Sequence, residues 1–300
     1  MIKIAYSDRF VLDLPEEHKF PMIKYELIKE QLLYEGTITE DNLFDPGLID
    51  EEIVRLTHDA TYLQRVKSQA LTKHEIRRIG FPMTEKLYKR SLSSSCGTLY
   101  AVKNALRYGI GFNTAGGTHH AFKAKGEGFC ILNDIAISSN WLLNTNEVQK
   151  ILVVDLDVHQ GNGTASIFEN NSKVFTFSMH GADNYPLKKE KSDLDIGLKA
   201  YTEDETYLGY LKHHLPRLIE SEKPDFIFYQ AGVDIIESDA LGKLNVSRQG
   251  CKQRDEIVLE ACYNNGIPVA VSMGGGYSPR VADIVDAHCN TYRSAFQIYD

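Results

Sequence analysis

The sequence has few cysteines and no arrangement of them that would build a disulfide framework or a thiolate metal site. Its five cysteines are scattered, odd in number and never spaced as Cys-x-x-Cys, so we expect reduced thiols in the core or on helices. Long apolar runs are also missing, since the longest are short strand-like segments, far below the roughly 18 residues of a membrane span. The first residues, MIKIAYSDRF, contain no leader-like apolar segment, so we expect a cytoplasmic protein.

Positive charge is in deficit: 33 Lys and Arg stand against 41 Asp and Glu, for a net charge of −8. With no basic run, the chain is a poor candidate for direct binding to nucleic acid or to an anionic membrane. It also lacks linkers, internal repeats and low-complexity stretches, so we expect a single domain over residues 1–300. A hydrophobic fraction of 43% is enough to bury a sizeable core.

The elements expected along the chain alternate between strand and helix. Apolar, β-branched runs lie at residues 2–6, 151–156, 173–179, 225–230 and 268–273. They lack polar alternation, which is typical of parallel strands buried on both faces. Helical patterns lie at residues 21–35, 93–108, 131–143, 203–222, 248–264 and 279–299. The pattern predicts an α/β protein whose ligand site lies beyond the carboxyl ends of the strands.

The run after the strongest strand, VVDLDVHQGNG, places Asp155, Asp157 and His159 at alternate positions. In an extended chain these three side chains point to one side, where they are costly to bury unless paired or bound to a metal. Asp234 follows another apolar strand and should reach the same edge of the sheet. Two aspartates and one histidine form a metal site with open coordination positions, which is the catalytic pattern. Taken singly, the Asp-x-Asp-x-His run could equally be an acidic loop at the strand end with a solvated histidine, and Asp234 alone would more often be a turn or helix-capping residue.

Two further segments carry candidate catalytic groups. His119 and His120 follow a Gly-Gly turn, and imidazole suits a general base or acid beside an activated water. Tyr277 follows three glycines after the last strand, and its hydroxyl could donate to a developing oxyanion. The same glycines could form a plain turn, but no Lys-Ser or Lys-Thr follows them, so a phosphate-binding P-loop is excluded.

In their order along the chain, which is His-His, Asp-x-Asp-x-His, Asp and Gly-Gly-Tyr, the four motifs resemble those of the zinc-dependent histone deacetylase family, which has the arginase/deacetylase fold. The likeness extends over essentially the whole chain and is closest to the class IV branch and its bacterial relatives. It implies a single-domain, three-layer α/β/α fold with a central, mostly parallel sheet of about eight strands.

The resemblance also implies roles for individual residues. Those that match the family's metal ligands are Asp157, His159 and Asp234, around one Zn²⁺, with Fe²⁺ as the alternative. Those that match its catalytic groups are His119, His120, Tyr277, Asp155 and Asn162. Those that match its substrate-binding groups are Gly128, Phe129 and the rim residue Leu241. The family's K⁺ or Na⁺ would be held by Asp155, Asp157, His159, Ser178 and Met179.

One position departs from many members of the family. Asn162 stands where they have the aspartate behind the second histidine, a pattern that the class IV branch shares. A neutral amide stabilises an imidazolium less than a carboxylate does, so His120 should have a lower pKa than in relatives with the aspartate. The second aromatic wall of the acyl tunnel stays open between His180 and Tyr185.

The function expected is the metal-dependent hydrolysis of acyl groups, acetyl or longer fatty acyl, from the lysine side chains of proteins or peptides. Small acylated amines such as polyamines are the alternative substrates. An arginase-like two-metal ureohydrolase fits less well, because only three clear ligands are present where two ions need bridging carboxylates. A non-catalytic acyl-lysine binder would be expected to have lost a ligand, a histidine or the tyrosine, and none is lost.

Overall fold

The apolar runs of the sequence form strands of one sheet. The computed structural model describes residues 1–15 and 17–300, and in them the strand pairings are all parallel. The eight strands are β1 (Ile4–Ala5), β2 (Leu43–Phe44), β3 (Ile110–Asn113), β4 (Ile151–Asp155), β5 (Val174–Gly181), β6 (Leu194–Leu198), β7 (Phe226–Gln230) and β8 (Val269–Ser272). Their order is β2-β1-β3-β8-β7-β4-β5-β6, which confirms the predicted parallel α/β sheet of about eight strands.

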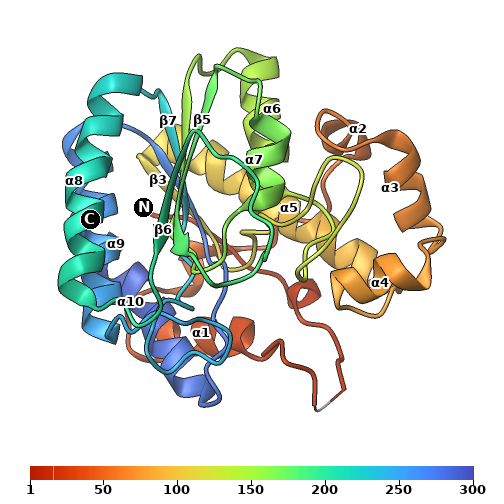
Figure 1. Cartoon of the computed structure of the whole chain (residues 1–300), viewed down its shortest axis with the longest axis horizontal. Coiled ribbons are helices and arrows are strands. Elements are labelled where there is room, and N and C mark those ends of the chain that lie inside the picture. The colour runs from red at the N-terminus through yellow and green to blue at the C-terminus, as the bar shows by residue number, and fades with distance from the viewer. Residues whose placement is uncertain (16) are drawn as a thin grey trace.

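Helices cover both faces of this sheet (Figure 1). One layer is formed by α1 (Lys24–Tyr34), α8 (Asp204–Glu222), α9 (Arg248–Asn264) and α10 (Val281–Tyr299). The other is formed by α5 (Glu85–Tyr108), α6 (Asp134–Thr145) and α7 (Asn162–Phe168). Every residue of β4, β7 and β8 is buried, as expected for strands packed between two helical layers.

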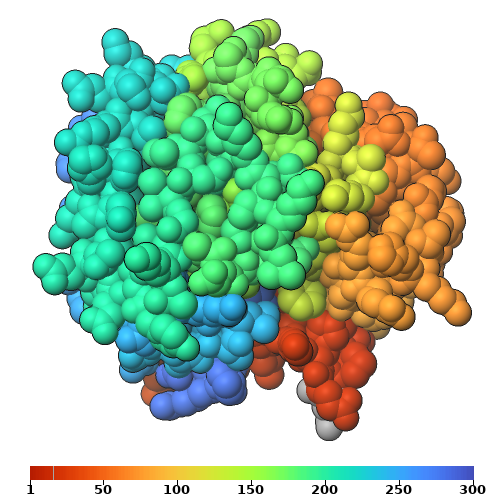
Figure 2. Space-filling model, viewed as in Figure 1, coloured from red at the N-terminus to blue at the C-terminus, as the bar shows by residue number. Residues whose placement is uncertain are grey.

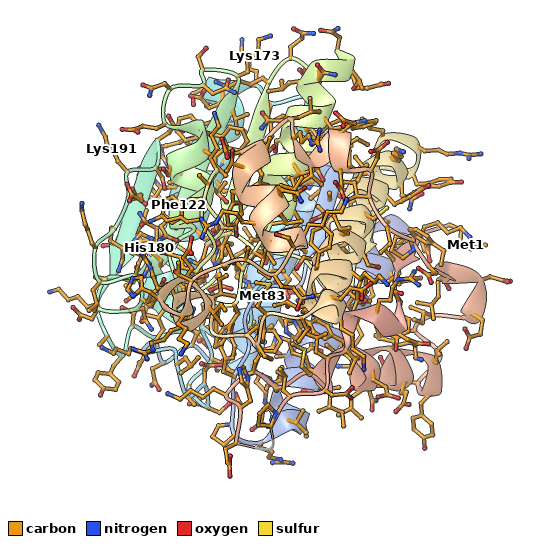
Figure 3. The ribbon with its side chains drawn as sticks, turned by 90° about the vertical axis from the view of Figure 1, so that its right-hand side faces the viewer. Met1, Met83, Phe122, Lys173, His180 and Lys191 are labelled. Carbon is orange, nitrogen blue, oxygen red and sulfur yellow. The ribbon has the colours of Figure 1, made fainter. Side chains whose placement is uncertain are left out.

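Three short helices form a lobe beside the sheet: α2 (Glu51–Val54), α3 (Ala60–Lys67) and α4 (Lys73–Ile79). Figure 2 shows this lobe in orange at one side of the molecule, next to yellow-green residues of the chain that follows α5. Figure 3 faces this side and labels Met83, which precedes α5, and Phe122, which follows the histidine pair. The lobe therefore reaches the segment that carries part of the candidate site.

Some elements differ from the sequence-based expectation. The strand β3 has only four residues directly after α5, and β6 contains an aspartate and a glycine at the sheet edge, so neither pattern is strong enough to predict. Helix α5 begins at Glu85, not near residue 93, because the hydroxyl of Thr84 accepts from the Leu87 amide (3.1 Å) and caps the helix there. The five cysteines are free and buried, as predicted.

The strand order places the functional loops together. The four strands β3, β8, β7 and β4 are neighbours at the centre of the sheet, so the loops that follow them leave from one edge. These loops carry the histidine pair, Tyr277, Asp234 and the Asp157–His159 run.

In the part of the chain that the structure describes, no helix is long and apolar enough to cross a membrane.

Candidate active site

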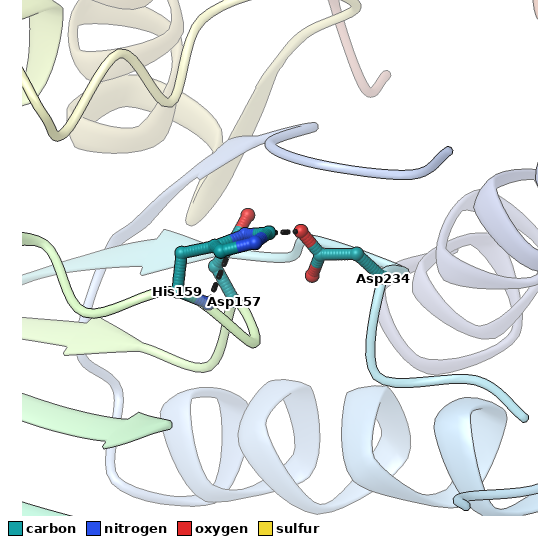
Figure 4. Close-up of side chains that lie close together, drawn as sticks. All are labelled: Asp157, His159 and Asp234. Carbon is teal, nitrogen blue, oxygen red and sulfur yellow. Dashed lines mark hydrogen bonds and ion pairs between the residues drawn. The ribbon is translucent and has the colours of Figure 1, made fainter. Parts of the chain in front are cut away.

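Three buried side chains from two of these loops converge on one point. The Nδ1 atom of His159 lies 3.1 Å from Oδ1 of Asp157 and 3.0 Å from Oδ2 of Asp234, as Figure 4 shows. One ligand atom from each residue lies within 4.8 Å of the other two. Two carboxylates and an imidazole are donors that Zn²⁺ and Fe²⁺ accept, so the residues fit the metal that the sequence predicted.

Backbone amides hold both carboxylates in place. Asp157 accepts from the amides of His159 (3.0 Å) and Gly275 (2.8 Å), and Asp234 accepts from that of Val158 (2.9 Å). A Cβ atom at Gly275 would lie 1.9 Å from Oδ2 of Asp234, so only glycine fits there. The glycines after β8 therefore let the backbone approach the metal cluster and close one side of it.

The charges of the cluster favour a cation. Burial and the nearby Asp157 raise the pKa of Asp234 to about 7. Burial lowers the pKa of His159, but hydrogen bonds to Asp157 and Asp234 outweigh this effect and raise it to about 10. A divalent cation among the three groups would hold both carboxylates ionised and the imidazole neutral.

The route by which these residues meet differs from the expected one. The strand β4 ends at Asp155, and residues 156–160 are irregular, so Asp155, Asp157 and His159 do not share one face of an extended strand. The prediction that all three point to one side was therefore wrong for Asp155. Its Oδ2 lies 2.7 Å from Nδ1 of His119, whereas Asp157 and His159 turn toward Asp234.

The two adjacent histidines have different partners. His119 is paired with Asp155, and Nδ1 of His120 lies 2.7 Å from Oδ1 of Asn162. For His119, burial lowers the pKa, but the charges of Asp155 and Asp157 outweigh it and raise the pKa to about 9. For His120, burial and the charge of His119 hold the pKa well below its ordinary 6.5. Asn162 thus lies where the resemblance expects the partner of the second histidine.

The predicted acyl pocket lies above the cluster. Gly128 has a φ of 55°, and a Cβ atom there would lie 2.6 Å from Cδ2 of His120, so the close approach requires glycine. The ring of Phe129 lies 6.1 Å from that of Tyr277, and the ring of Tyr185 lies 5.0 Å from that of His120. These rings line a cleft of about 470 Å³.

The second aromatic wall, for which the sequence allowed His180 or Tyr185, is formed by Tyr185. Its side chain lines the cleft, whereas the Nδ1 atom of buried His180 faces Oγ of Ser178 at 2.9 Å. Leu241 also lines the cleft, and its carbonyl accepts from Nδ2 of Asn184 (2.7 Å).

Tyr277 lies between the cleft and the metal cluster. It lines both the inner pocket, with Asp157 and His159, and the outer cleft. Its backbone amide donates to Asp239 (2.6 Å), which fixes the loop. Burial and the charge of Asp157 raise the pKa of the phenol well above 10, so its hydroxyl keeps the proton. The group can therefore donate a hydrogen bond but does not ionise near neutral pH.

The residues expected around a monovalent cation lie on two paired strands and the loop beyond. Asp155 of β4 is the register partner of Ser178 of β5, and Met179 follows, fully buried. Asp157 and His159 complete the set on the irregular segment after β4.

Several residues of the site were not identified from the sequence. Glu127 is buried beside Gly128 and contacts Asn162, and Arg90 lines the inner pocket. Lys24 is fully buried, donates to the carbonyl of Gly274 (3.1 Å) and has a pKa lowered by burial to about 8. For Glu127 a signal was available, because it directly precedes the predicted substrate-binding pair Gly128 and Phe129.

Known proteins are similar to this chain over most of its length. An uncharacterized protein of Picosynechococcus sp. is 43% identical over 99% of both chains. Histone deacetylase 2 of Arabidopsis thaliana is 28% identical over 77% of this chain and 62% of its own length. The acetoin utilization protein AcuC of Staphylococcus aureus is 28% identical over 91% of this chain and 76% of its own.

Solved structures share the fold. The HD domain of HDA15 matches with a TM-score of 0.84 over 99% of this chain and 88% of that domain, at 20% identity. An HDAC homologue complexed with SAHA matches with the same score over 99% and 84%, at 23% identity. The histone deacetylase domain family matches residues 18–292. The chain therefore belongs to the histone deacetylase family and is a hydrolase of the deacetylase type.

Proposed function

We propose that this chain uses one Zn²⁺, with Fe²⁺ as the alternative, to remove acyl groups from the lysine side chains of proteins or peptides. The observation that carries the proposal is the buried cluster of Asp157, His159 and Asp234, of which Asp157 and His159 line a pocket together with His120 and Tyr277. A metal bound there would polarise the acyl carbonyl and acidify the attacking water.

The chain's own residues would supply the proton transfers. His120 is neutral, because its pKa is held below 6.5 by burial, so it can accept the proton of the attacking water. The hydroxyl of Tyr277 would donate to the oxyanion that forms at the acyl carbon. An imidazolium of the pair would then protonate the leaving amine.

The outer cleft supports a peptide over a polyamine. Among the residues that the structure describes, its lining includes the basic residues Lys19, Arg77, Arg78 and Lys243 but only one acidic residue, Asp183. Arg78 is paired with the buried Glu127, but Lys19, Arg77 and Lys243 still form a basic rim on a chain with a net charge of −8. A polyamine carries several positive charges and would be repelled there, whereas acidic residues beside an acyl-lysine would be attracted.

A small acylated substrate is the second candidate. The relative AcuC, whose name refers to acetoin utilization, aligns over 91% of this chain. The proposal has two further parts. One is the assignment to class IV, which rests on Asn162, and the other is a bound K⁺ or Na⁺ at Asp155 and Ser178.

Deacylation assays on the zinc-loaded chain test the proposal. One lysine peptide would carry acetyl, octanoyl or myristoyl groups, with acidic or basic flanking residues, beside a monoacetylated polyamine. We expect release of acyl groups from the peptide, fastest with acidic flanks, and loss of release in Asp157→Ala. Turnover of the polyamine alone would support the second candidate, and two tightly bound metal ions per chain would favour a ureohydrolase.

A further inference from the structure

Glu127 is a buried carboxylate for which the mechanism above has no use. Only 3% of its surface is exposed, and it lies directly before Gly128 in the wall of the pocket. Its Oε1 accepts from Nδ2 of Asn162 (2.7 Å) and from the hydroxyl of Tyr185 (3.0 Å). Its Oε2 is paired with Arg78 and lies 3.6 Å from Nζ of Lys125.

The position of this carboxylate is fixed by the backbone. The amide of Gly128 donates to the carbonyl of Arg78 (3.0 Å), and that of Cys130 donates to the carbonyl of Glu127 (3.0 Å). The same turn brings Gly128 against the ring of His120. Glu127 is therefore held at a defined place beside the second histidine, with Asn162 between them.

The contacts determine which way the amide of Asn162 faces. A carboxylate accepts hydrogen bonds and cannot donate them, so the group facing Glu127 must be the NH₂ of Asn162. The carbonyl oxygen of Asn162 then faces His120, 2.7 Å from Nδ1. Since that oxygen can only accept, Nδ1 of His120 must carry a proton, and the lone pair of the neutral ring is left on Nε2.

The opposite orientation of the Asn162 amide would exchange the protonated and unprotonated nitrogens of His120. With the amide of Asn162 rotated, its NH₂ would donate to Nδ1 of His120, and the proton of the neutral ring would move to Nε2. The ring would then have no lone pair outside the hydrogen bond to Asn162. The rotated carbonyl would also face the carboxylate of Glu127, which is repulsive in a buried setting.

We propose that Glu127 is a positioning residue, which fixes His120 in its Nδ1-protonated tautomer by holding the amide of Asn162 in one orientation. The inference deepens the proposed function, and it rests on that function where it concerns turnover. The chain thereby places a carboxylate behind its second histidine one residue further away than the aspartate that many family members have. The negative charge is present, but a neutral amide separates it from the ring.

Nitrogen NMR of the zinc-loaded full chain with ¹⁵N-labelled histidine tests the tautomer directly. We expect His120, assigned with His120→Gln, to show a protonated Nδ1 and an unprotonated Nε2. In Glu127→Leu, which removes the acceptor, a second population protonated on Nε2 should appear. In Lys125→Met, which alters only the outer side of the same carboxylate, the spectrum of His120 should not change. An unchanged tautomer in folded Glu127→Leu would overturn the proposal.

Turnover gives a second readout. In Glu127→Leu we expect kcat to fall by about 10–100-fold, because the main loss concerns a general base, and KM to change by less than about threefold, because the hydroxyl of Tyr185 in the cleft wall also loses its acceptor. Glu127→Gln can still present an oxygen to Asn162 and should recover most of kcat. Lys125→Met should keep the activity of the unaltered chain. Equal losses in the Leu and Gln variants, or a loss confined to KM, would contradict a positioning role.

A double substitution tests whether Glu127 acts on His120 through residue 162. Asn162→Asp alone places two carboxylates 2.7 Å apart, where one must take up a proton, so activity should fall. Adding Glu127→Gln removes the repulsion, and the double variant should be at least about fivefold more active than Asn162→Asp. Losses that simply multiply would show that the two residues are not coupled. If no acyl substrate is turned over, the proposed function fails, whereas the NMR result still decides the role of Glu127.

Discussion

Two neighbouring histidines receive different properties from the residues behind them. The rings of His119 and His120 lie 4.1 Å apart, yet one faces the carboxylate of Asp155 and the other the amide of Asn162. Accordingly the pKa of His119 is raised to about 9, where Asp155 outweighs the effect of burial, and burial lowers that of His120 well below 6.5. Near neutral pH, the pair therefore holds one proton-carrying and one proton-accepting imidazole.

The comparison shows that sequence adjacency says little about chemical role. Both histidines sit on one irregular segment after β3, and both are almost fully buried. Their partners come from different places, Asp155 from the end of β4 and Asn162 from the first turn of α7. What separates the two histidines is the charge of the partner, because Asp155 is an acid and Asn162 is a neutral amide.

The largest expected effect is the difference between the variants that lack one histidine each. We expect His120→Ala to lower kcat by about 10²–10⁴-fold, because it removes the neutral base, and His119→Ala to lower it less. Rates on an acetyl-lysine peptide should be compared at equal zinc content, measured by atomic emission. An equal loss in both variants, or a greater loss in His119→Ala, would show that the two share the base function or that the assignment is reversed.

Neither histidine is expected to stabilise the oxyanion, which is the proposed role of a third residue, Tyr277. Tyr277→Phe removes only the hydroxyl, so we expect kcat to fall by about 10²–10³-fold, the usual loss for one oxyanion donor. Zinc content and the affinity for the substrate should be almost unchanged. Full activity in this variant would mean that the histidines and the metal site suffice for oxyanion stabilisation.

Asp155→Asn makes the two histidines alike, because each then faces an amide. We expect kcat/KM to fall by about tenfold, since His119 would lose the charge that keeps it protonated. Asp155 is also expected to contact the monovalent cation, so the assay should be repeated over a range of K⁺ concentrations. If K⁺ fully restored kcat/KM, the effect would be due to the cation and would say nothing about the protonation of His119.

The sequence predicted this site better where a motif follows a strong strand. β4 and β7 are apolar and fully buried, so the arrival of Asp157 and Asp234 at one edge followed from the parallel sheet. The strand β3, which leads to the histidine pair, is short and was not predicted. The pair was nevertheless recognised, because adjacent histidines after two glycines are distinctive in any setting.

Contacts between distant segments could not be predicted in this way. Glu127 and Asn162 are 35 residues apart and meet only because α7 begins beside the turn that holds Gly128. Likewise, Tyr185 and His180 are equally plausible walls by sequence, and only the packing of the loop after β5 selects Tyr185. Motifs thus identify which residues react, whereas the fold decides which ones orient them.

The smallest effect predicted is on the pH dependence of the unaltered chain. Because the pKa of His120 lies well below 6.5, this residue stays neutral at mildly acidic pH, and kcat/KM should be almost constant from pH 8 down to pH 6.5. Burial and the charge of His119 lower the pKa of His120, and the charge of Asp157 raises it; His159, which lowers it when charged, is neutral once it holds the metal. Zinc content measured at each pH separates loss of metal from protonation of the base. A fall in kcat/KM between pH 8 and 6.5 at full zinc content would show that the proton acceptor has an ordinary or raised pKa, which would favour His119 over His120.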